Sequence, residues 1–242
     1  MPYRNRLPVA ATCLALLFAG AGLPAAAFAA PLKKADAAKP AKPAEEPLAF
    51  SEAAVQVAEW AVASGDNRGL PFAVIDKSSA QVLVFSSDGR LKGAAPVLLG
   101  SAVGDHSAPG VGELELASIP PEARTTPAGR FLAGWGPATG GKTVFWVDYD
   151  TAVSLHPVAE TNREEKREQR LASPGPDDNR ITYGCINVSA KFYRKVVRPT
   201  FKGTYGVVYV LPDTMPLKRA IPGFKPQRKA EGLLSLTTAA AD

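Results

Sequence analysis

The chain has 242 residues, of which 46% are hydrophobic and 21% charged, a balance typical of a globular protein rather than of a disordered one. The formal net charge is only +5, with 28 Lys and Arg against 23 Asp and Glu residues. No segment gathers the positive residues into one dense basic face, so a nucleic-acid binder is not expected.

A secretory signal peptide is expected at residues 1–29. Arg4 and Arg6 precede an apolar run at residues 7–23, and the Ala-Phe-Ala sequence at 27–29 has small residues where a signal peptidase cleaves. An uncleaved membrane anchor is the alternative, but Gly and Pro residues interrupt the run. We therefore expect an exported protein, periplasmic or associated with the cell wall, without stable membrane insertion after cleavage.

Cysteine content limits the chemistry of the mature protein. Cleavage at this position removes Cys13 and leaves Cys185 as the last cysteine. One cysteine cannot form an internal disulfide, so its thiol is inert and buried, bonded to another chain, or reactive.

Two further segments precede the expected catalytic region. Residues 30–48 are rich in Ala, Lys and Pro and hold little apolar bulk, which predicts a linker. Residues 49–69 show apolar residues at helical spacing, with Ser51 as the N-cap, and predict an N-terminal helix.

From residue 70 onward the pattern favours strands, because short runs of β-branched and aromatic residues alternate with turn residues. The expected strands are residues 72–76, 81–85, 91–99, 113–117, 129–133, 143–149, 152–156 and 205–211. Many short strands and few helices predict a mainly β sandwich or barrel with a few short helices, formed as one domain by residues 70–212.

Three segments around these strands have their own expectations. The charged run within residues 160–179 predicts a solvated helix or a lid. A short helix capped by Ser189 and ended by Pro199 follows the cysteine. The basic tail at residues 213–242 is expected to be flexible.

The sequence around Cys185 has the features of a nucleophile site. Gly184 lacks a Cβ, so the backbone before the cysteine can turn sharply, and the amides of Tyr183, Gly184 and Cys185 could face a developing oxyanion. His156 ends an upstream strand and is the expected general base. The backbone carbonyl of Pro157 is the nearest group that could orient the other ring nitrogen.

The motif resembles that of the L,D-transpeptidase catalytic domain (YkuD-type). That family carries a histidine and then Ser/Thr-His-Gly-Cys-apolar-Arg/Asn, which is matched here by His156 and by Thr-Tyr-Gly-Cys-Ile-Asn at residues 182–187. Residues 126–131 resemble the family's Thr-Pro-x-Gly-x-Phe segment, and residues 72–85 resemble its opening hairpin. The resemblance covers about residues 71–212.

This resemblance implies a cysteine-dependent L,D-transpeptidase that acts on peptidoglycan stem peptides through a thioester, without a metal or an organic cofactor. Cys185 would be the nucleophile and His156 the base. Thr182, Tyr183 and Gly184 would form the motif loop, and Asn187 and Arg180 would support it.

Three features depart from the family pattern. Tyr183 replaces a second histidine, Asn187 replaces the commoner arginine, and the interval between His156 and Cys185 is unusually long. An L,D-carboxypeptidase, an amide transferase that joins wall to protein, and a catalytically silent cell-wall-binding module remain alternatives. The sequence does not indicate an oligomeric state.

Overall fold

The computed structural model describes residues 49–159 and 162–226. The expected signal peptide and linker lie outside the described residues. The strands are β1 (Phe72–Asp76), β2 (Gln81–Phe85), β3 (Leu91–Pro96), β4 (Leu99–Gly100), β5 (Gly129–Pro137), β6 (Thr143–Asp148), β7 (Val153–Pro157), β8 (Arg180–Thr182), β9 (Ile186–Val188) and β10 (Gly206–Val210).

The helices are short apart from the first. The α-helices are α1 (Glu52–Ala63), α2 (Arg167–Leu171), α3 (Ala190–Phe192), α4 (Arg198–Thr200) and α5 (Leu217–Ala220). The remaining helical turns are η1 (Val111–Glu113), η2 (Leu116–Ser118), η3 (Pro121–Ala123), η4 (Thr139–Gly141), η5 (Arg163–Glu165), η6 (Pro176–Asn179) and the π-helical η7 (Tyr193–Val197). Within the described ranges, none of these helices combines the length and apolar character needed to cross a membrane.

Eight strands form one sheet in the order β3-β2-β1-β10-β5-β6-β7-β9, and β4 pairs with β8 in a second, two-stranded sheet. Most neighbours are antiparallel, but β1 runs parallel to β10 and β7 runs parallel to β9. The prediction of a mainly β fold with few short helices is confirmed.

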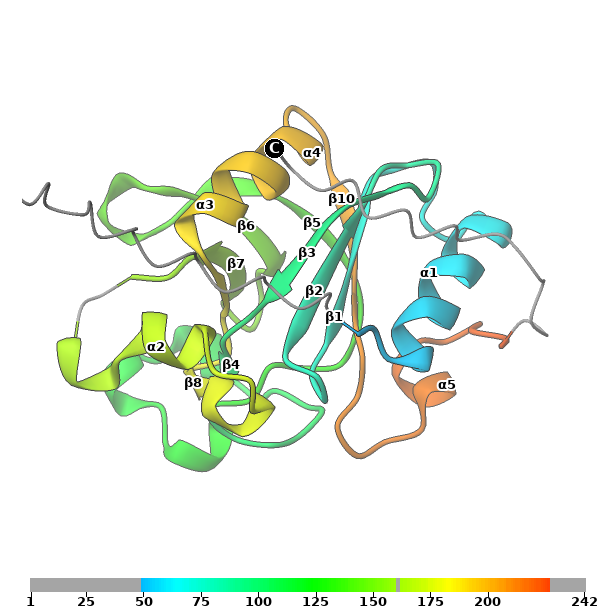
Figure 1. Cartoon of the computed structure of the whole chain (residues 1–242). Coiled ribbons are helices and arrows are strands. Elements are labelled where there is room, and N and C mark those ends of the chain that lie inside the picture. The colour runs from blue at the N-terminus through cyan, green and yellow to red at the C-terminus, as the bar shows by residue number, and fades with distance from the viewer. Residues whose placement is uncertain (1–48, 160–161, 227–242) are drawn as a thin grey trace, which may run out of the picture. The chain divides into compact units, whose positions relative to one another are not determined.

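Strands β1, β2 and β10 are buried on both faces. One face packs in the main core with the strands around the cysteine, and the other packs against α1, α5 and the residues after α5 (Figure 1). Burial on both faces explains why these strands read as continuous apolar runs rather than as alternating ones. The expected N-terminal helix is present, and Ser51 accepts from the amide of Ala54 at 3.1 Å as its N-cap.

The strand expected at residues 113–117 is wrong, because the chain forms the helical turns η1 and η2 there. The alternation of Glu and Leu in this segment suggested a strand with one buried face. Leu114 and Leu116 are instead 46% and 62% exposed. The leucines have no sheet to pack on, so local turn formation prevails.

The expectation of a flexible tail from residue 213 is wrong for residues 213–226. The amides of Asp213, Thr214 and Met215 all donate to the carboxylate of Asp105, at 2.6, 2.8 and 2.8 Å. Phe224 then packs edge-on against Trp60 of α1, with ring centroids 5.5 Å apart. Residues 227–242 lie outside the described residues.

A buried ion cluster links this C-terminal segment to the strands before the cysteine. The ammonium of Lys77 lies 2.9 Å from Asp105 and 3.1 Å from Asp213, and its side chain is fully buried. Arg180 of β8 donates to Asp213 at 2.7 Å. Lys77 also donates to the carbonyl of Thr126 at 2.9 Å. Burial alone would raise the pKa of Asp105, but hydrogen bonds from three amides and from Lys77 hold that pKa below its usual range.

Two buried tyrosines give a direct test of this packing. The hydroxyl of Tyr193 has no hydrogen-bond partner among the described residues, whereas that of Tyr209 donates to Asp66 at 2.6 Å. Tyr193→Phe is therefore expected to leave the free energy of unfolding unchanged or to raise it by up to about 1 kcal/mol. Tyr209→Phe should lower it by about 1–3 kcal/mol. Urea unfolding midpoints check both, and equal losses would contradict the assignment of partners.

Candidate active site

The parallel pairing of β7 with β9 brings the predicted nucleophile and base together. Leu155 pairs with Ile186 and His156 pairs with Asn187, so Cys185 lies one position before the start of β9 and close to Ser154. Side chains alternate across a strand, so Ser154 and His156 share one face with Cys185 and Asn187. The opposite face, with Leu155 and Ile186, lies in the core.

The long interval between the histidine and the cysteine has a topological reason. Parallel neighbours cannot be joined by a tight hairpin and need a crossover of a dozen or more residues. The charged segment, with η5, α2 and η6, forms this crossover between β7 and β8. The charged segment is therefore part of the connection between the parallel strands β7 and β9, and this connection is longer than the crossover requires.

Hydrogen bonds to both ring nitrogens define the tautomer of His156. Nδ1 lies 2.8 Å from the carbonyl oxygen of Pro157, which confirms the prediction that this carbonyl orients the ring. A carbonyl only accepts, so Nδ1 carries the hydrogen. Nε2 lies 3.0 Å from Nδ2 of Asn187 and accepts from that amide. Nε2 is thus the basic nitrogen of the neutral ring.

The thiol of Cys185 is half-buried and has weak polar contacts. Its sulfur lies 3.7 Å from the hydroxyl of Ser154 and 3.6 Å from the carbonyl of Ala152. Burial raises the pKa of the thiol, but the interaction with the His156 imidazole outweighs it, and the pKa lies below its ordinary value. The reciprocal effect operates at His156, where burial lowers the pKa but the sulfur raises it above its ordinary value. Both shifts favour a thiolate–imidazolium pair.

Asn187 connects this pair to the crossover segment. Its side chain is fully buried, and its Oδ1 accepts from Nη1 of Arg167 at 3.0 Å. Arg167 can only donate, so it holds Oδ1 toward itself and the amide nitrogen toward His156. Arg167 is itself held by Glu165 at 2.5 Å. At this arginine the charged segment packs on the site, in contrast to the expected solvated face.

The motif loop is braced from within. The hydroxyl of Thr182 donates to the carbonyl of Cys185 at 2.6 Å and accepts from the amide of Gly184 at 3.2 Å. Gly184 has φ +129°, and a Cβ there would lie 2.8 Å from the carbonyl oxygen of Thr125. The glycine is needed for the turn and for this close approach. The hydroxyl of Thr126 donates to the carbonyl of Gly184 at 2.8 Å.

These hydrogen bonds reduce the number of backbone amides that are available to stabilise an oxyanion. The amide of Gly184 is engaged by Thr182, so it does not face a substrate in this structure. The amides of Tyr183 and Cys185 donate to no group in the described part of the chain. These two amides remain the candidate donors.

The side chain of Tyr183, which replaces a histidine of the family pattern, packs against residues outside the candidate active site. The guanidinium of Arg124 lies 4.3 Å from the centre of its ring, and the ring also contacts a small cluster formed by Val111, Ile119 and Ala123. Arg180 is likewise engaged, because it pairs with Asp213. Arg180 is therefore not the solvated arginine that was expected. Its guanidinium is also not free to bind a substrate carboxylate in this structure.

Sequence reasoning missed Ser154 as a neighbour of the sulfur and Arg167 as the partner of Asn187. Ser154 stands two positions before His156 in a strand, and this spacing alone places both on one face. No feature of the sequence indicated that Arg167 would contact Asn187. Within the described ranges, no three His, Cys, Asp or Glu side chains are grouped to hold a metal ion.

Replacing Arg167 by methionine is expected to raise the pKa of His156 and thereby to favour the thiolate–imidazolium form of the pair. The substitution removes a positive charge that lowers the pKa of His156. It also frees the amide of Asn187 to turn its oxygen toward a protonated Nε2. Cys185 should then react with iodoacetamide at lower pH than in the parent protein. The exposed Arg163→Met is the matched control and should leave the pH dependence of alkylation unchanged. An equal shift in both variants would contradict the proposed influence of Arg167 on His156 through Asn187.

No protein-family model matches the chain, and no curated protein matches it. Solved structures similar to it include the helical cell shape determining protein Pgp2 from Campylobacter jejuni, with 14% identity, a TM-score of 0.40, and coverage of 60% of this chain and 49% of that chain. An L,D-transpeptidase of Enterococcus faecium is 18% identical, with a TM-score of 0.34 and coverage of 58% and 49%. An L,D-transpeptidase from Mycobacterium smegmatis is 19% identical, with a TM-score of 0.33 and coverage of 58% of each chain. The chain spans about half the length of the first two, and the similarity concerns the fold only.

Proposed function

We propose that the chain is a cysteine-dependent L,D-transpeptidase that acts on peptidoglycan stem peptides in the periplasm or cell wall. The observation that carries this proposal is the pairing of β7 with β9, which sets Cys185 and His156 on one face with a lowered thiol pKa. The resemblance of residues 182–187 to the family motif supplies the substrate class.

The proposed reaction begins with transfer of the thiol proton to Nε2 of His156. The thiolate attacks the carbonyl of the third stem residue, and the amides of Tyr183 and Cys185 stabilise the oxyanion. The C–N bond to the terminal D-amino acid breaks, and the imidazolium gives its proton to the leaving amine. An acceptor amine then attacks the thioester, loses a proton to His156, and releases the thiolate.

The hydrogen bond from Asn187 favours a second candidate function. Nε2 must gain a proton during the reaction, but here it accepts from the amide of Asn187 at 3.0 Å. Catalysis therefore requires the amide to turn away or flip. If Arg167 prevents this change, the domain is a wall-binding module that retains the fold without turnover.

Incubation of the exported protein with tetrapeptide muropeptides tests these functions. Transpeptidation gives cross-linked dimers, whereas an L,D-carboxypeptidase gives tripeptides because water resolves the same thioester. An amide transferase that joins wall to protein gives protein-linked muropeptides. Absence of any product, together with retained binding to sacculi, would refute the enzyme and support the wall-binding module.

A further inference from the structure

A cleft of about 670 Å³ lies between strands β5 and β6 and the helical segment at residues 190–203. Its lining is formed by Trp135, Thr143, Arg194, Arg198, Pro199, Lys202 and Gly203. None of the residues described above as the candidate active site lines it. A volume in this range suits a small-molecule ligand.

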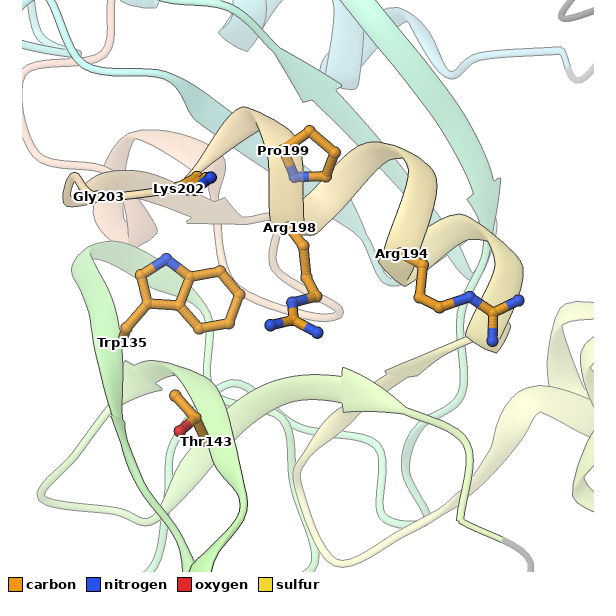
Figure 2. Close-up of a pocket in the computed structure, with 7 residues that line it drawn as sticks. All are labelled: Trp135, Thr143, Arg194, Arg198, Pro199, Lys202 and Gly203. Carbon is orange, nitrogen blue, oxygen red and sulfur yellow. The ribbon is translucent and has the colours of Figure 1, made fainter.

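The helical wall of the cleft carries three cations at intervals of four residues. Arg194 and Arg198 stand four residues apart, about one turn of the helical segment, and Lys202 follows beyond the end of α4. All three are exposed, and none forms an ion pair with a residue in the described ranges. Figure 2 shows the guanidinium of Arg198 extending from the helical segment toward the strands that carry Trp135 and Thr143.

The opposite wall offers an aromatic ring that is held in place. The indole nitrogen of Trp135 donates to the carbonyl of Phe201 at 2.7 Å, and its ring packs on Phe145 with centroids 5.1 Å apart. These contacts fix the ring plane while part of the indole remains in the cleft lining. A fixed aromatic ring beside unpaired cations provides both a surface for the apolar C–H face of a sugar ring and charges for an anion.

The helical wall also has an unusual geometry. Residues Tyr193–Val197 form a π-helical turn between α3 and α4. Such turns are rare and are found disproportionately at functional sites. In this chain the turn begins directly before Arg194 and ends directly before Arg198, so it sets the spacing of the two arginines in the cleft.

We propose that this cleft is a binding site for an anionic sugar, with the sugar ring on the indole of Trp135 and its carboxylate or phosphate beside Arg198, while Arg194 and Lys202 add positive charge on either side. Thr143 supplies a hydroxyl for the ring substituents. This site is independent of Cys185 and of the proposed thioester chemistry. A carboxylate and a phosphate have the same requirement for cations, so the experiment separates them.

The test follows the indole N–H signals by nuclear magnetic resonance during titration with glucose, glucuronate and glucose 6-phosphate. The chain has three tryptophans, and Trp135→Phe assigns the signal of interest. We expect a saturable shift of the Trp135 signal with at least one anionic sugar and none with glucose. Glucuronate alone identifies a carboxylate site, glucose 6-phosphate alone a phosphate site, and both a general anion site.

A matched pair of variants assigns the binding to the cleft. Replacing Arg194, Arg198 and Lys202 together by glutamine should raise the Kd about tenfold, because three favourable interactions with the anion are lost at once. Replacing Lys191, Lys195 and Lys218 by glutamine removes the same charge from exposed positions outside the cleft and should leave the Kd unchanged. No saturable shift with either anionic sugar, an equal shift with glucose, or equal losses in both variants would overturn the proposal.

Discussion

Replacing Cys185 by serine is expected to lower turnover of tetrapeptide muropeptides by about 10³-fold or more and to abolish the covalent intermediate. A serine hydroxyl has a much higher pKa than a thiol, and the His156 imidazole that lowers the thiol pKa cannot ionise an alcohol to the same extent. Product formation measured by chromatography gives the rate. Mass spectrometry of the protein during turnover detects the acyl adduct.

Ser154→Ala provides the control for this prediction. Its hydroxyl lies 3.7 Å from the sulfur, so its removal changes the surroundings of the thiol but not the nucleophile. We expect a loss below about tenfold, in the range of one weak neutral hydrogen bond. Comparable losses in Cys185→Ser and Ser154→Ala, or an acyl adduct that persists in Cys185→Ser, would show that Cys185 is not the attacking group.

Replacing His156 by glutamine is expected to raise the pKa of Cys185 above that of an ordinary thiol. In the parent protein, burial raises this pKa and the imidazole lowers it by more. Glutamine keeps polar atoms at the position but cannot carry a positive charge, so burial, the largest influence on this pKa, is then opposed only by the hydrogen bonds to Ser154. The thiolate should then form only at higher pH, and turnover should fall by about 10²–10⁴-fold because the general base is also lost.

Alkylation by iodoacetamide across a pH series measures this change directly. In the parent protein the pKa of Cys185 lies below its ordinary value and that of His156 lies above its ordinary value, because the thiolate and the imidazolium stabilise each other. His156→Gln should move the inflection of the alkylation rate to higher pH. His106→Gln is the control, because the His106 side chain is exposed and its contact with Thr125 is made by the backbone carbonyl, which the substitution keeps. An unchanged inflection in His156→Gln would remove the basis for the proposed pair.

The strands that form the centre of the sheet could be predicted from the sequence. The predicted bounds of β1 and β2 agree with the structure, because apolar runs flanked by turn residues leave few alternatives. β8 and β9 were not predicted, since three residues on either side of a turn are too short to show a pattern. The strand at residues 113–117 was wrongly predicted because alternation alone does not reveal whether a neighbouring strand is available.

Cys185, His156 and Gly184 of the candidate site could be predicted from the sequence, but Ser154, Arg167 and most of the contacts could not. His156 and the Pro157 carbonyl followed from order and chemistry, and Gly184 followed from the need for a turn. The donation from the Gly184 amide to Thr182 depends on the detailed turn geometry. The contact of Arg167 with Asn187 depends on how the crossover folds back, and one arginine among several in a charged run carries no sign of it.

The Lys77 cluster determines where the chain can be shortened. Ending the protein at residue 212, the predicted domain boundary, would remove Asp213 and leave the buried ammonium with a single carboxylate. It would also release Arg180, the first residue of strand β8, which leads into the cysteine turn. Truncation at residue 212 would therefore weaken the support of the loop that carries Cys185. A version ending after Phe224 would keep the contacts of Asp213 with Lys77 and with Arg180.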